Sequence, residues 1–183
     1  MFRVREQVMT ISLAPFVPSQ QDVVKKMLEL AQVNENDTVY DLGCGDGRIL
    51  ITAIKEFNAK NAVGYEMRDD LYKNTTLKIQ KEQLENRIKV FNEDLLDANI
   101  SDATVITLYL TTSGNSRLKP KLSIEAQKGV KVVSHDFDIV GWEYAKRENF
   151  GGHTIYLYKI PDAFSTTRKR RRLSLFSRKR NRR

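Results

Sequence analysis

Glycines on alternate residues follow an acidic residue in the N-terminal third of the chain. In the segment 39–48, whose sequence is VYDLGCGDGR, Gly43, Gly45 and Gly47 follow Asp41. A short apolar, strand-like stretch precedes the glycines, and a helical pattern follows them. Glycine permits a tight turn and lets backbone N–H groups approach a ligand at the positive end of the helix dipole. The segment therefore predicts a nucleotide-type binding loop rather than a turn that only needs a flexible backbone.

The spacing of these glycines indicates which nucleotide the loop would hold. A dinucleotide-binding loop has the pattern Gly-x-Gly-x-x-Gly, but Arg48 occupies its last position and Gly47 comes one residue early. This departure disfavours NAD. The segment resembles instead the first motif of the class I S-adenosylmethionine-dependent methyltransferases. That resemblance implies S-adenosyl-L-methionine as the cofactor, with its ammonium group held by Asp41 and its amino-acid part against the loop of Gly43, Cys44, Gly45 and Gly47.

Two further acids follow predicted strands at similar places. Glu66 lies nineteen residues after Gly47, where a carboxylate can accept hydrogen bonds from both hydroxyls of a ribose. Asp94 resembles the family's acid that meets the adenine amino group, with Glu93 as an alternative. Taken alone, Glu66 could equally be a solvated surface acid. Together these groups are expected to meet, because ligands of open α/β sheets bind at the carboxyl ends of the strands.

The cysteine and histidine content bears on other kinds of site. The single cysteine, Cys44, excludes an intrachain disulfide and a cysteine-based zinc site, and it favours a reducing compartment such as the cytoplasm. No adjacent base is evident to lower the pKa of its thiol, so a small loop residue is favoured over a nucleophile. His135 and His153 lie eighteen residues apart without further metal-ligand neighbours. We therefore expect hydrogen-bonded structural histidines and predict no metal.

Helical and strand-like patterns alternate through most of the chain. Apolar residues at helical spacing predict helices over about 20–32, capped by Ser19, and over 46–57, 70–84 and 117–127. Strands are predicted over 38–42, 62–66, 88–92, 104–110 and 130–134, and a turn containing Gly151-Gly152 joins a final antiparallel pair at 144–148 and 154–160. Strands separated by helices imply parallel βαβ units. The predicted fold is α/β, a Rossmann-like, mainly parallel seven-stranded sheet with helices on both faces and a C-terminal antiparallel hairpin.

The positive charge of the chain is concentrated at its C-terminal end. The 183 residues carry 31 Lys and Arg against 23 Asp and Glu, a net charge of +8, and Arg168 to Arg183 contains ten basic residues and no acid. Such a block is expected to be disordered in isolation and to contact nucleic acid or, as second choice, an anionic membrane surface, unless it only solubilises the chain. No apolar run approaches the roughly 20 residues of a transmembrane helix. The predicted organisation is an N-terminal segment bordering the active site (1–18), a methyltransferase domain (19–162) and a basic tail (163–183).

Methyl transfer from a sulfonium donor needs aligned reactants more than a catalytic triad. The methyl group is intrinsically reactive, so the protein aligns the acceptor with the breaking S–C bond and excludes water. A lysine acceptor has a reference pKa of about 10.4, so presenting its neutral amine near pH 7 costs roughly 4–5 kcal/mol, which desolvation in an aromatic pocket reduces. We predict Phe16, Tyr109 and Trp142 as the catalytic aromatic walls. Core packing is the alternative explanation for these rings.

The segment after the fourth predicted strand narrows the substrate class. Enzymes that methylate amino groups of adenine or glutamine resemble one another in an Asn/Asp-Pro-Pro-aromatic motif here, whereas this chain has Leu-Tyr-Leu at 108–110. Methylation of a cytosine carbon would need a cysteine nucleophile, and Cys44 lies in the cofactor loop. Pro-Phe-Val-Pro-Ser at 15–19, Thr-Leu-Tyr-Leu at 107–110, Leu-Lys-Pro-Lys-Leu at 118–122, Ser134 and Gly-Trp at 141–142 together resemble one group of seven-β-strand protein-lysine methyltransferases. That group includes broad-specificity archaeal enzymes and enzymes that act on the ATP-synthase c-subunit.

This resemblance extends over about residues 15–160 and implies which residues border the cofactor and the entering lysine. They are Phe16, Val17, Pro18, Tyr109, Leu110 and Trp142. The implied function is transfer of methyl groups from S-adenosylmethionine to lysine side chains of proteins, with basic nucleic-acid-binding proteins as the substrate hypothesis. The alternatives are an RNA methyltransferase that binds through the tail and a non-catalytic nucleic-acid-binding module. A monomeric, cytoplasmic protein is expected.

Overall fold

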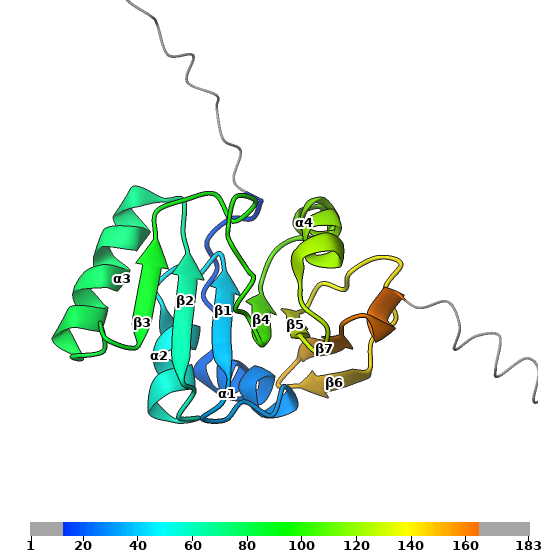
Figure 1. Cartoon of the computed structure of the whole chain (residues 1–183), viewed down its shortest axis with the longest axis horizontal. Helices are drawn as coiled ribbons and strands as arrows, with labels where there is room; N and C mark the ends of the chain where they lie inside the picture. The colour runs from blue at the N-terminus through cyan, green and yellow to red at the C-terminus, as the bar shows by residue number, and fades with distance from the viewer. Residues whose placement is uncertain (1–12, 165–183) are drawn as a thin grey trace, which may run out of the picture.

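The computed structural model describes residues 13–164 and contains one mixed sheet with helices on both faces (Figure 1). The strands are β1 (Thr38–Leu42), β2 (Asn61–Tyr65), β3 (Ile88–Phe91), β4 (Val105–Leu108), β5 (Lys131–His135), β6 (Lys146–Phe150) and β7 (His153–Lys159). The helices are α1 (Gln21–Leu30), α2 (Arg48–Lys55), α3 (Asp69–Lys81) and α4 (Thr112–Glu125), followed at the end by a short 3-10 helix, η1 (Asp162–Phe164).

The order of the strands reverses in the middle of the sheet. From one edge to the other the order is β3-β2-β1-β4-β5-β7-β6, in which β1 to β5 are parallel and β7 is antiparallel to both of its neighbours (Figure 1). The chain moves outward from β1 to β3 and then returns to the other side of β1 as β4. Ligand crevices form at the carboxyl ends of the strands beside such a reversal. The predicted seven-stranded α/β fold with a C-terminal hairpin is confirmed.

Successive residues of the central strands place their side chains in two hydrophobic cores, one on each face of the sheet. In β1, Val39 belongs to the core that includes residues of α1, α2 and α3, whereas Tyr40 belongs to the core that includes residues of α4. All residues of β4 are buried, which is typical of parallel strands covered on both sides. The doubly covered strands form a rigid frame for the loops at their carboxyl ends.

The first helix begins two residues after its predicted cap. Helix α1 follows Gln20, whose side chain makes no capping hydrogen bond. The prediction that Ser19 caps this helix is wrong. Its hydroxyl lies 2.9 Å from Nδ1 of His135 instead. Ser19 therefore connects the segment before α1 to the end of β5.

Two other helices begin at residues set by the local backbone. Helix α2 begins at Arg48 rather than at 46, because Gly47 takes the left-handed φ of 73° just before it. Helix α4 begins at Thr112 rather than at 117, because the Thr111 side chain accepts a capping hydrogen bond from the Gly114 amide. Both helices therefore point their N-terminal ends toward the carboxyl edge of the sheet, where the chain leaves β1 and β4.

Gly64 in β2 is packed directly against the neighbouring loop and helix. A Cβ atom at this position would lie 2.6 Å from Sγ of Cys44 and 2.6 Å from Cδ1 of Leu50. We expect Gly64→Ala to destabilise the fold by about 1–3 kcal/mol through overpacking. Each kcal/mol lowers the melting temperature of a domain of this size by roughly 2–4 °C, which calorimetry can measure. The same substitution in a Cys44→Ala background should cost less, and an unchanged melting temperature for Gly64→Ala would contradict this packing.

Predictions about the ends of the chain fall partly beyond the described residues. Positions 1–12 of the N-terminal segment and positions 165–183 of the basic tail, including Arg168 to Arg183, lie outside them. The domain boundaries at 18/19 and 162/163 therefore stay predictions. Within residues 13–164, no helix is both long enough and apolar enough to cross a membrane.

Candidate active site

The loop between β1 and α2 has a left-handed backbone at each of its glycines. The φ angle is 98° at Gly43, 52° at Gly45 and 73° at Gly47. Residues with side chains rarely adopt these angles, which explains the alternate spacing of glycine in the sequence. The amide of Gly43 donates to the carbonyl oxygen of Tyr65 at 2.9 Å, and the Thr75 hydroxyl donates to the carbonyl oxygen of Gly45 at 2.7 Å. The loop is thereby held between β2 and α3.

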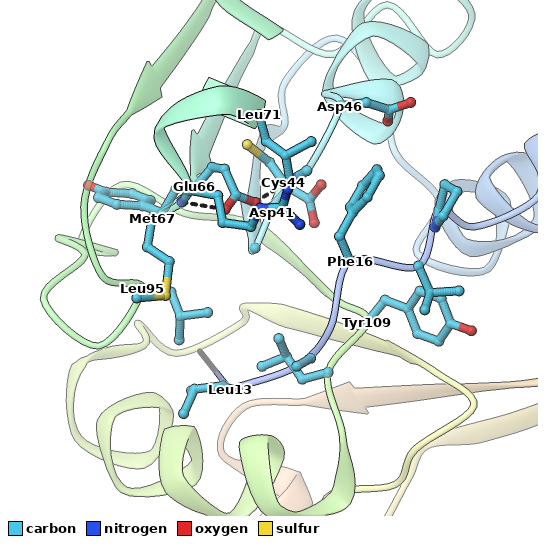
Figure 2. Close-up of a pocket in the computed structure, with 18 of the residues that line it drawn as sticks. Leu13, Phe16, Asp41, Cys44, Asp46, Glu66, Met67, Leu71, Leu95 and Tyr109 are labelled. Atoms are coloured by element: carbon cyan, nitrogen blue, oxygen red, sulfur yellow. Dashed lines mark hydrogen bonds between the residues drawn. The ribbon is translucent and has the colours of Figure 1, made fainter. Parts of the chain in front are cut away.

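Glu66 follows β2 directly, and its carboxylate turns toward the glycine loop (Figure 2). Its Oε2 accepts a hydrogen bond from the Gly45 amide at 3.0 Å, and its Oε1 accepts one from the Arg68 amide at 2.8 Å. These bonds fix the buried carboxylate in one orientation. Each oxygen keeps further lone-pair capacity, so Glu66 can still accept hydrogen bonds from a ligand.

Asp41 is a buried carboxylate near the end of β1. Its side chain is 3% exposed, and its Oδ1 accepts a hydrogen bond from the Thr107 hydroxyl of β4 at 2.8 Å. No cationic side chain pairs with it among residues 13–164. Burial raises the pKa of the Asp41 carboxyl to about 7; the Thr107 hydrogen bond opposes this effect, and the negative charges of Glu66 and Asp46 add to it. A buried carboxyl in this state is well suited to a cationic ligand group.

The segment before α1 crosses over the glycine loop. Its start is held by the Thr111 hydroxyl, which donates to the carbonyl oxygen of Leu13 at 3.0 Å. Its end is held by the Arg48 guanidinium, which donates to the carbonyl oxygen of Ser19. Between these points the Phe16 ring covers Gly45 so closely that a Cβ atom there would lie 2.5 Å from the ring (Figure 2). The segment therefore forms one wall of the space above the loop.

These groups enclose a cavity at the strand reversal (Figure 2). Its empty space amounts to about 800 Å³, counting the part that is open to solvent. The predicted site residues that line it are Phe16, Val17, Pro18, Asp41, Gly43, Cys44, Gly45, Glu66, Asp94, Tyr109 and Leu110, and Glu93 lies beside Asp94. Their convergence agrees with the prediction that acids and glycines after successive strands share one site.

The cavity also has apolar lining that sequence reasoning missed. Met67, Leu71 and Leu95 border it, as does Leu13 at the start of the crossing segment (Figure 2). Met67 directly follows Glu66, and Leu95 directly follows Asp94. Their positions next to the predicted acids could have identified both as lining residues from the sequence. These side chains provide the apolar surface that a flat aromatic ligand group needs.

Two predicted site residues do not line the cavity. Gly47 lies against Thr75, since a Cβ atom at this glycine would fall 2.5 Å from Cγ2 of that residue, and it serves the turn into α2. Trp142, predicted at the active-site rim, is corrected to a core residue, because it is 7% exposed and its ring packs at 5.7 Å from Tyr158 and 5.6 Å from Phe164, measured between centroids. Core packing was the alternative explanation for this tryptophan.

Cys44 lies inside the loop with its side chain buried. Burial raises the pKa of its thiol well above the usual value, and the charges of Asp41 and Glu66 add to this effect. The thiol therefore stays protonated at neutral pH and is a poor nucleophile. This agrees with its prediction as a small loop residue.

Tyr109 separates the cavity from the two histidines. Its ring lines the cavity and stacks on His135 with 3.8 Å between centroids. Burial raises the pKa of the Tyr109 hydroxyl, and the charge of Asp136 and a hydrogen bond to it add to the shift. Burial also lowers the pKa of His135 to about 4, so its imidazole is neutral at neutral pH. Nε2 of His135 lies 3.0 Å from Nδ1 of His153, and Asp136, a neighbour that the prediction overlooked, places its Oδ2 2.8 Å from the same Nδ1.

Comparison with known proteins agrees with this geometry. A protein-lysine N-methyltransferase of Saccharolobus islandicus is 47% identical over 150 residues, covering 80% of this chain and 93% of that protein. A lysine N-methyltransferase of Xenopus laevis that is named for the ATP-synthase c-subunit is 27% identical over 146 residues, covering 80% of this chain and 63% of that protein. The crystal structure of an RNA methyltransferase from Salinibacter ruber in complex with S-adenosyl-L-homocysteine superposes with a TM-score of 0.78 at 41% identity, covering 82% of this chain and 97% of that one.

The family model of the ANTKMT methyltransferase domain matches residues 41–146, which run from Asp41 in β1 to the start of β6. This range includes the glycine loop, Glu66, Asp94 and Tyr109, and with them most of the cavity. The match spans more than half of the chain and agrees with the 47% identity to the archaeal relative. The chain therefore belongs to the ANTKMT methyltransferase domain family, and the predicted methyltransferase is confirmed.

Proposed function

We propose that this chain is a protein-lysine N-methyltransferase that takes its methyl group from S-adenosylmethionine. The 47% identity to an archaeal protein-lysine N-methyltransferase supports lysine as the methyl acceptor, because the match covers nearly the whole of that relative. The cavity at the strand reversal supports the choice of cofactor. It offers a buried carboxyl without a cationic partner among residues 13–164, backbone amides beside glycines, and a fixed acid for a ribose.

Each part of the cofactor has a matching group in the cavity. Asp41 holds the ammonium group, because a buried carboxylate gains most from a charged hydrogen-bond donor. The loop of Gly43, Cys44 and Gly45 lies against the amino-acid part, and Glu66 accepts hydrogen bonds from the ribose hydroxyls. Asp94 receives the adenine amino group, with Glu93 as an alternative. The apolar side chains Met67, Leu71 and Leu95 cover the adenine ring.

The protein's own contribution to the reaction is alignment and the exclusion of water. The bound cofactor supplies a methyl group on a positively charged sulfur. Phe16, Val17 and Tyr109 line the cavity and favour the neutral amine of an entering lysine, because an apolar environment lowers the pKa of an ammonium group. The Tyr109 hydroxyl keeps its proton at neutral pH and faces Asp136 rather than acting as a base. The proton of the lysine ammonium therefore leaves to solvent before transfer.

Both ends of the chain are proposed to help the enzyme reach its substrates. Residues 13–18 of the N-terminal segment line the cavity, and the Phe16 ring lies above the loop. The ten basic residues of Arg168 to Arg183 attract nucleic acid or an anionic surface. Such contacts bring the enzyme close to basic, lysine-rich proteins that bind nucleic acid. These proteins are the proposed substrates of a monomeric, cytoplasmic enzyme.

Glu66 allows a direct test of the cofactor arrangement. Glu66→Gln should weaken S-adenosylmethionine binding by roughly tenfold, because hydrogen bonds to a charged group contribute about 1.5–3 kcal/mol and the amide retains part of that. Titration calorimetry measures the change. Glu85→Gln, at an exposed acid that does not line the cavity, is the control and should leave the affinity unchanged. An unchanged affinity for Glu66→Gln would contradict the assignment of Glu66 to the ribose.

The accepting atom can be identified in one experiment. The full chain is incubated with a cell extract and S-adenosylmethionine carrying a deuterated methyl group, and proteins and nucleosides are analysed separately by mass spectrometry. We expect the label on lysine side chains, and no label with the Asp41→Asn variant. Label confined to nucleosides would overturn the lysine assignment.

An RNA methyltransferase is the second candidate, and one observation favours it. The solved structure that is 41% identical to this chain carries that description. In this case the basic tail would bind the RNA substrate directly. Nuclease treatment of the extract before the reaction separates the candidates, because it removes the substrate of an RNA enzyme and leaves protein lysines available.

A further inference from the structure

A second cluster of polar side chains lies beyond Tyr109, outside the cofactor cavity. His135 ends β5 and pairs with Ile155 in the antiparallel strand β7, so His153 at the start of β7 lies beside it. Nε2 of His135 lies 3.0 Å from Nδ1 of His153. Oδ2 of Asp136 lies 2.8 Å from Nδ1 of His153 and 3.3 Å from Nε2 of His135. Two imidazole nitrogens and one carboxylate oxygen thus form a closed triangle.

Hydrogen bonds cannot satisfy all three contacts of this triangle at the same time. A neutral imidazole carries one N–H group and one lone pair. If Nδ1 of His153 carries the proton, it can share this proton between His135 and Asp136, which leaves a nitrogen lone pair and a carboxylate oxygen facing each other at 3.3 Å. If Nε2 of His135 donates to His153 instead, the 2.8 Å contact of His153 with Asp136 has no proton. A metal cation bound to both nitrogens and to the oxygen would leave none of these three atoms without a binding partner.

The sides of the triangle also have the lengths expected for ligands of one metal ion. Nitrogen and oxygen ligands lie about 2.0–2.2 Å from such ions, so ligands at octahedral or tetrahedral angles are separated by roughly 2.8–3.6 Å. The three observed separations of 2.8, 3.0 and 3.3 Å fall in this range.

Surrounding groups orient two of the three side chains. The Ser19 hydroxyl lies 2.9 Å from Nδ1 of His135, which leaves Nε2 of that ring facing the triangle. The Thr154 amide donates to Oδ1 of Asp136 at 2.9 Å, which turns Oδ2 toward the histidines. Asp136 itself has the left-handed φ of 59°, an uncommon conformation that aims its carboxylate. Outer contacts of this kind are typical of metal ligands.

We propose that His135, Asp136 and His153 form a binding site for a divalent transition-metal ion of the zinc type. Two imidazoles favour borderline ions such as Zn²⁺ and Co²⁺ over Mg²⁺ and Ca²⁺, which take oxygen ligands. The His135 side chain is fully buried, whereas those of Asp136 and His153 are 28% and 23% exposed, so solvent reaches the cluster from the side of these two residues. Through Ser19 and Tyr109, the ion would hold the segment before α1 and one wall of the cavity against β5 and β7.

The composition of the chain makes this site easy to test. The full sequence contains two histidines and one cysteine, so two imidazole ligands from a single chain can only be His135 and His153. The full chain, without an affinity tag, is stripped of metal and titrated with Co²⁺ while visible absorption is recorded. We expect one Co²⁺ per chain with nitrogen-ligand absorption, and displacement of Co²⁺ by Zn²⁺.

Variants distinguish the metal site from a hydrogen-bonded triad. Asp136→Asn keeps a residue that tolerates a left-handed backbone, and His153→Gln keeps a polar side chain; each should weaken Co²⁺ binding at least tenfold. Ser19→Ala should weaken it by about tenfold, because outer contacts contribute that much to affinity. Asp138→Asn, an exposed acid two residues along, is the matched control and should bind Co²⁺ normally.

Thermal unfolding gives a second readout that needs no methyl transfer. Excess Zn²⁺ should raise the melting temperature of the wild-type chain and of Asp138→Asn, but not that of Asp136→Asn. No Co²⁺ uptake by the folded wild-type chain, or equal uptake by Asp136→Asn and His153→Gln, would overturn the proposal and leave a hydrogen-bonded triad only.

Discussion

The Asp41→Asn variant is expected to lose cofactor binding while its cofactor-free form becomes more stable. Removing one partner of a buried, hydrogen-bonded charge pair costs about 2–5 kcal/mol. This corresponds to a dissociation constant for S-adenosylmethionine roughly 30-fold to several thousand-fold higher. Asparagine keeps an acceptor for the Thr107 hydroxyl and nearly the same shape, so the change removes chiefly the charge. Titration calorimetry of the wild-type chain and the variant measures the loss.

The gain in stability follows from the direction of the pKa shift. The pKa of Asp41 is raised to about 7 in the folded protein, against about 3.9 in an unfolded chain. Its contribution to stability is therefore fully present below pH 4 and is lost as pH rises through about 7. At pH 8 the wild-type chain holds an ionised, buried carboxylate, whereas Asp41→Asn does not. The melting temperature of the variant should exceed that of the wild type at pH 8, and the difference should shrink toward pH 5.

A surface acid provides the control for both effects. Asp102 is exposed, so Asp102→Asn should change neither cofactor affinity nor the pH dependence of the melting temperature. If Asp41→Asn melts below the wild type at every pH, the carboxylate stabilises the cofactor-free fold. That result would contradict the assignment of Asp41 as a group kept for a cationic ligand.

The same titration couples cofactor binding to pH. Because binding uses the ionised form of Asp41, the cofactor-free protein must release a proton when it binds below about pH 7. The apparent affinity should fall by about tenfold for each pH unit below that value. Calorimetry at pH 6 in two buffers of different ionisation enthalpy counts the released proton. Equal heats in the two buffers would show that Asp41 is already ionised in the free protein.

Local patterns predicted the frame of this site because it is built from short-range features. Gly43, Gly45 and Gly47 each need a left-handed backbone, so their spacing is visible in the sequence. The parallel strands other than the edge strand β3 are buried on both faces and read as short apolar runs, and Glu66 follows one of them. Such features depend on neighbouring residues and a general rule for parallel sheets.

Features that depend on contacts between distant segments were missed. The start of α4 was hidden because its first turns contain Gly114 and Asn115, which are poor helix formers, and tertiary packing buries both. The triangle of His135, Asp136 and His153 arises from the register between β5 and β7, which local patterns do not determine. The burial of Trp142 likewise depends on rings from the last strand and the short helix after it.

The Gly45→Ala variant should weaken cofactor binding by roughly tenfold to several hundred-fold. Alanine at the left-handed φ of 52° strains the loop by about 1–2 kcal/mol, and affinity falls to the extent that the loop relaxes this strain in the cofactor-free protein and must restore it on binding. Its Cβ would also lie 2.5 Å from Cε2 and 2.9 Å from Cδ2 of Phe16, so the ring must leave its place above the loop. Displacement of this ring opens the wall of the cavity that the segment before α1 provides. Titration calorimetry with S-adenosylmethionine measures the combined loss.

A double-mutant cycle separates the steric effect from backbone strain. In a Phe16→Ala background the crowding is gone, so Gly45→Ala should cost only the strain. The difference between the two backgrounds should be about 0.5–3 kcal/mol, the usual coupling between residues in contact. Gly151→Ala is the matched control, because Gly151 has a similar φ of 58° and nothing within 4 Å of its Cβ position. It should leave cofactor affinity unchanged. Strict additivity of Gly45→Ala and Phe16→Ala would mean that Phe16 does not rest on the loop, and the wall of the cavity would then have to come from elsewhere.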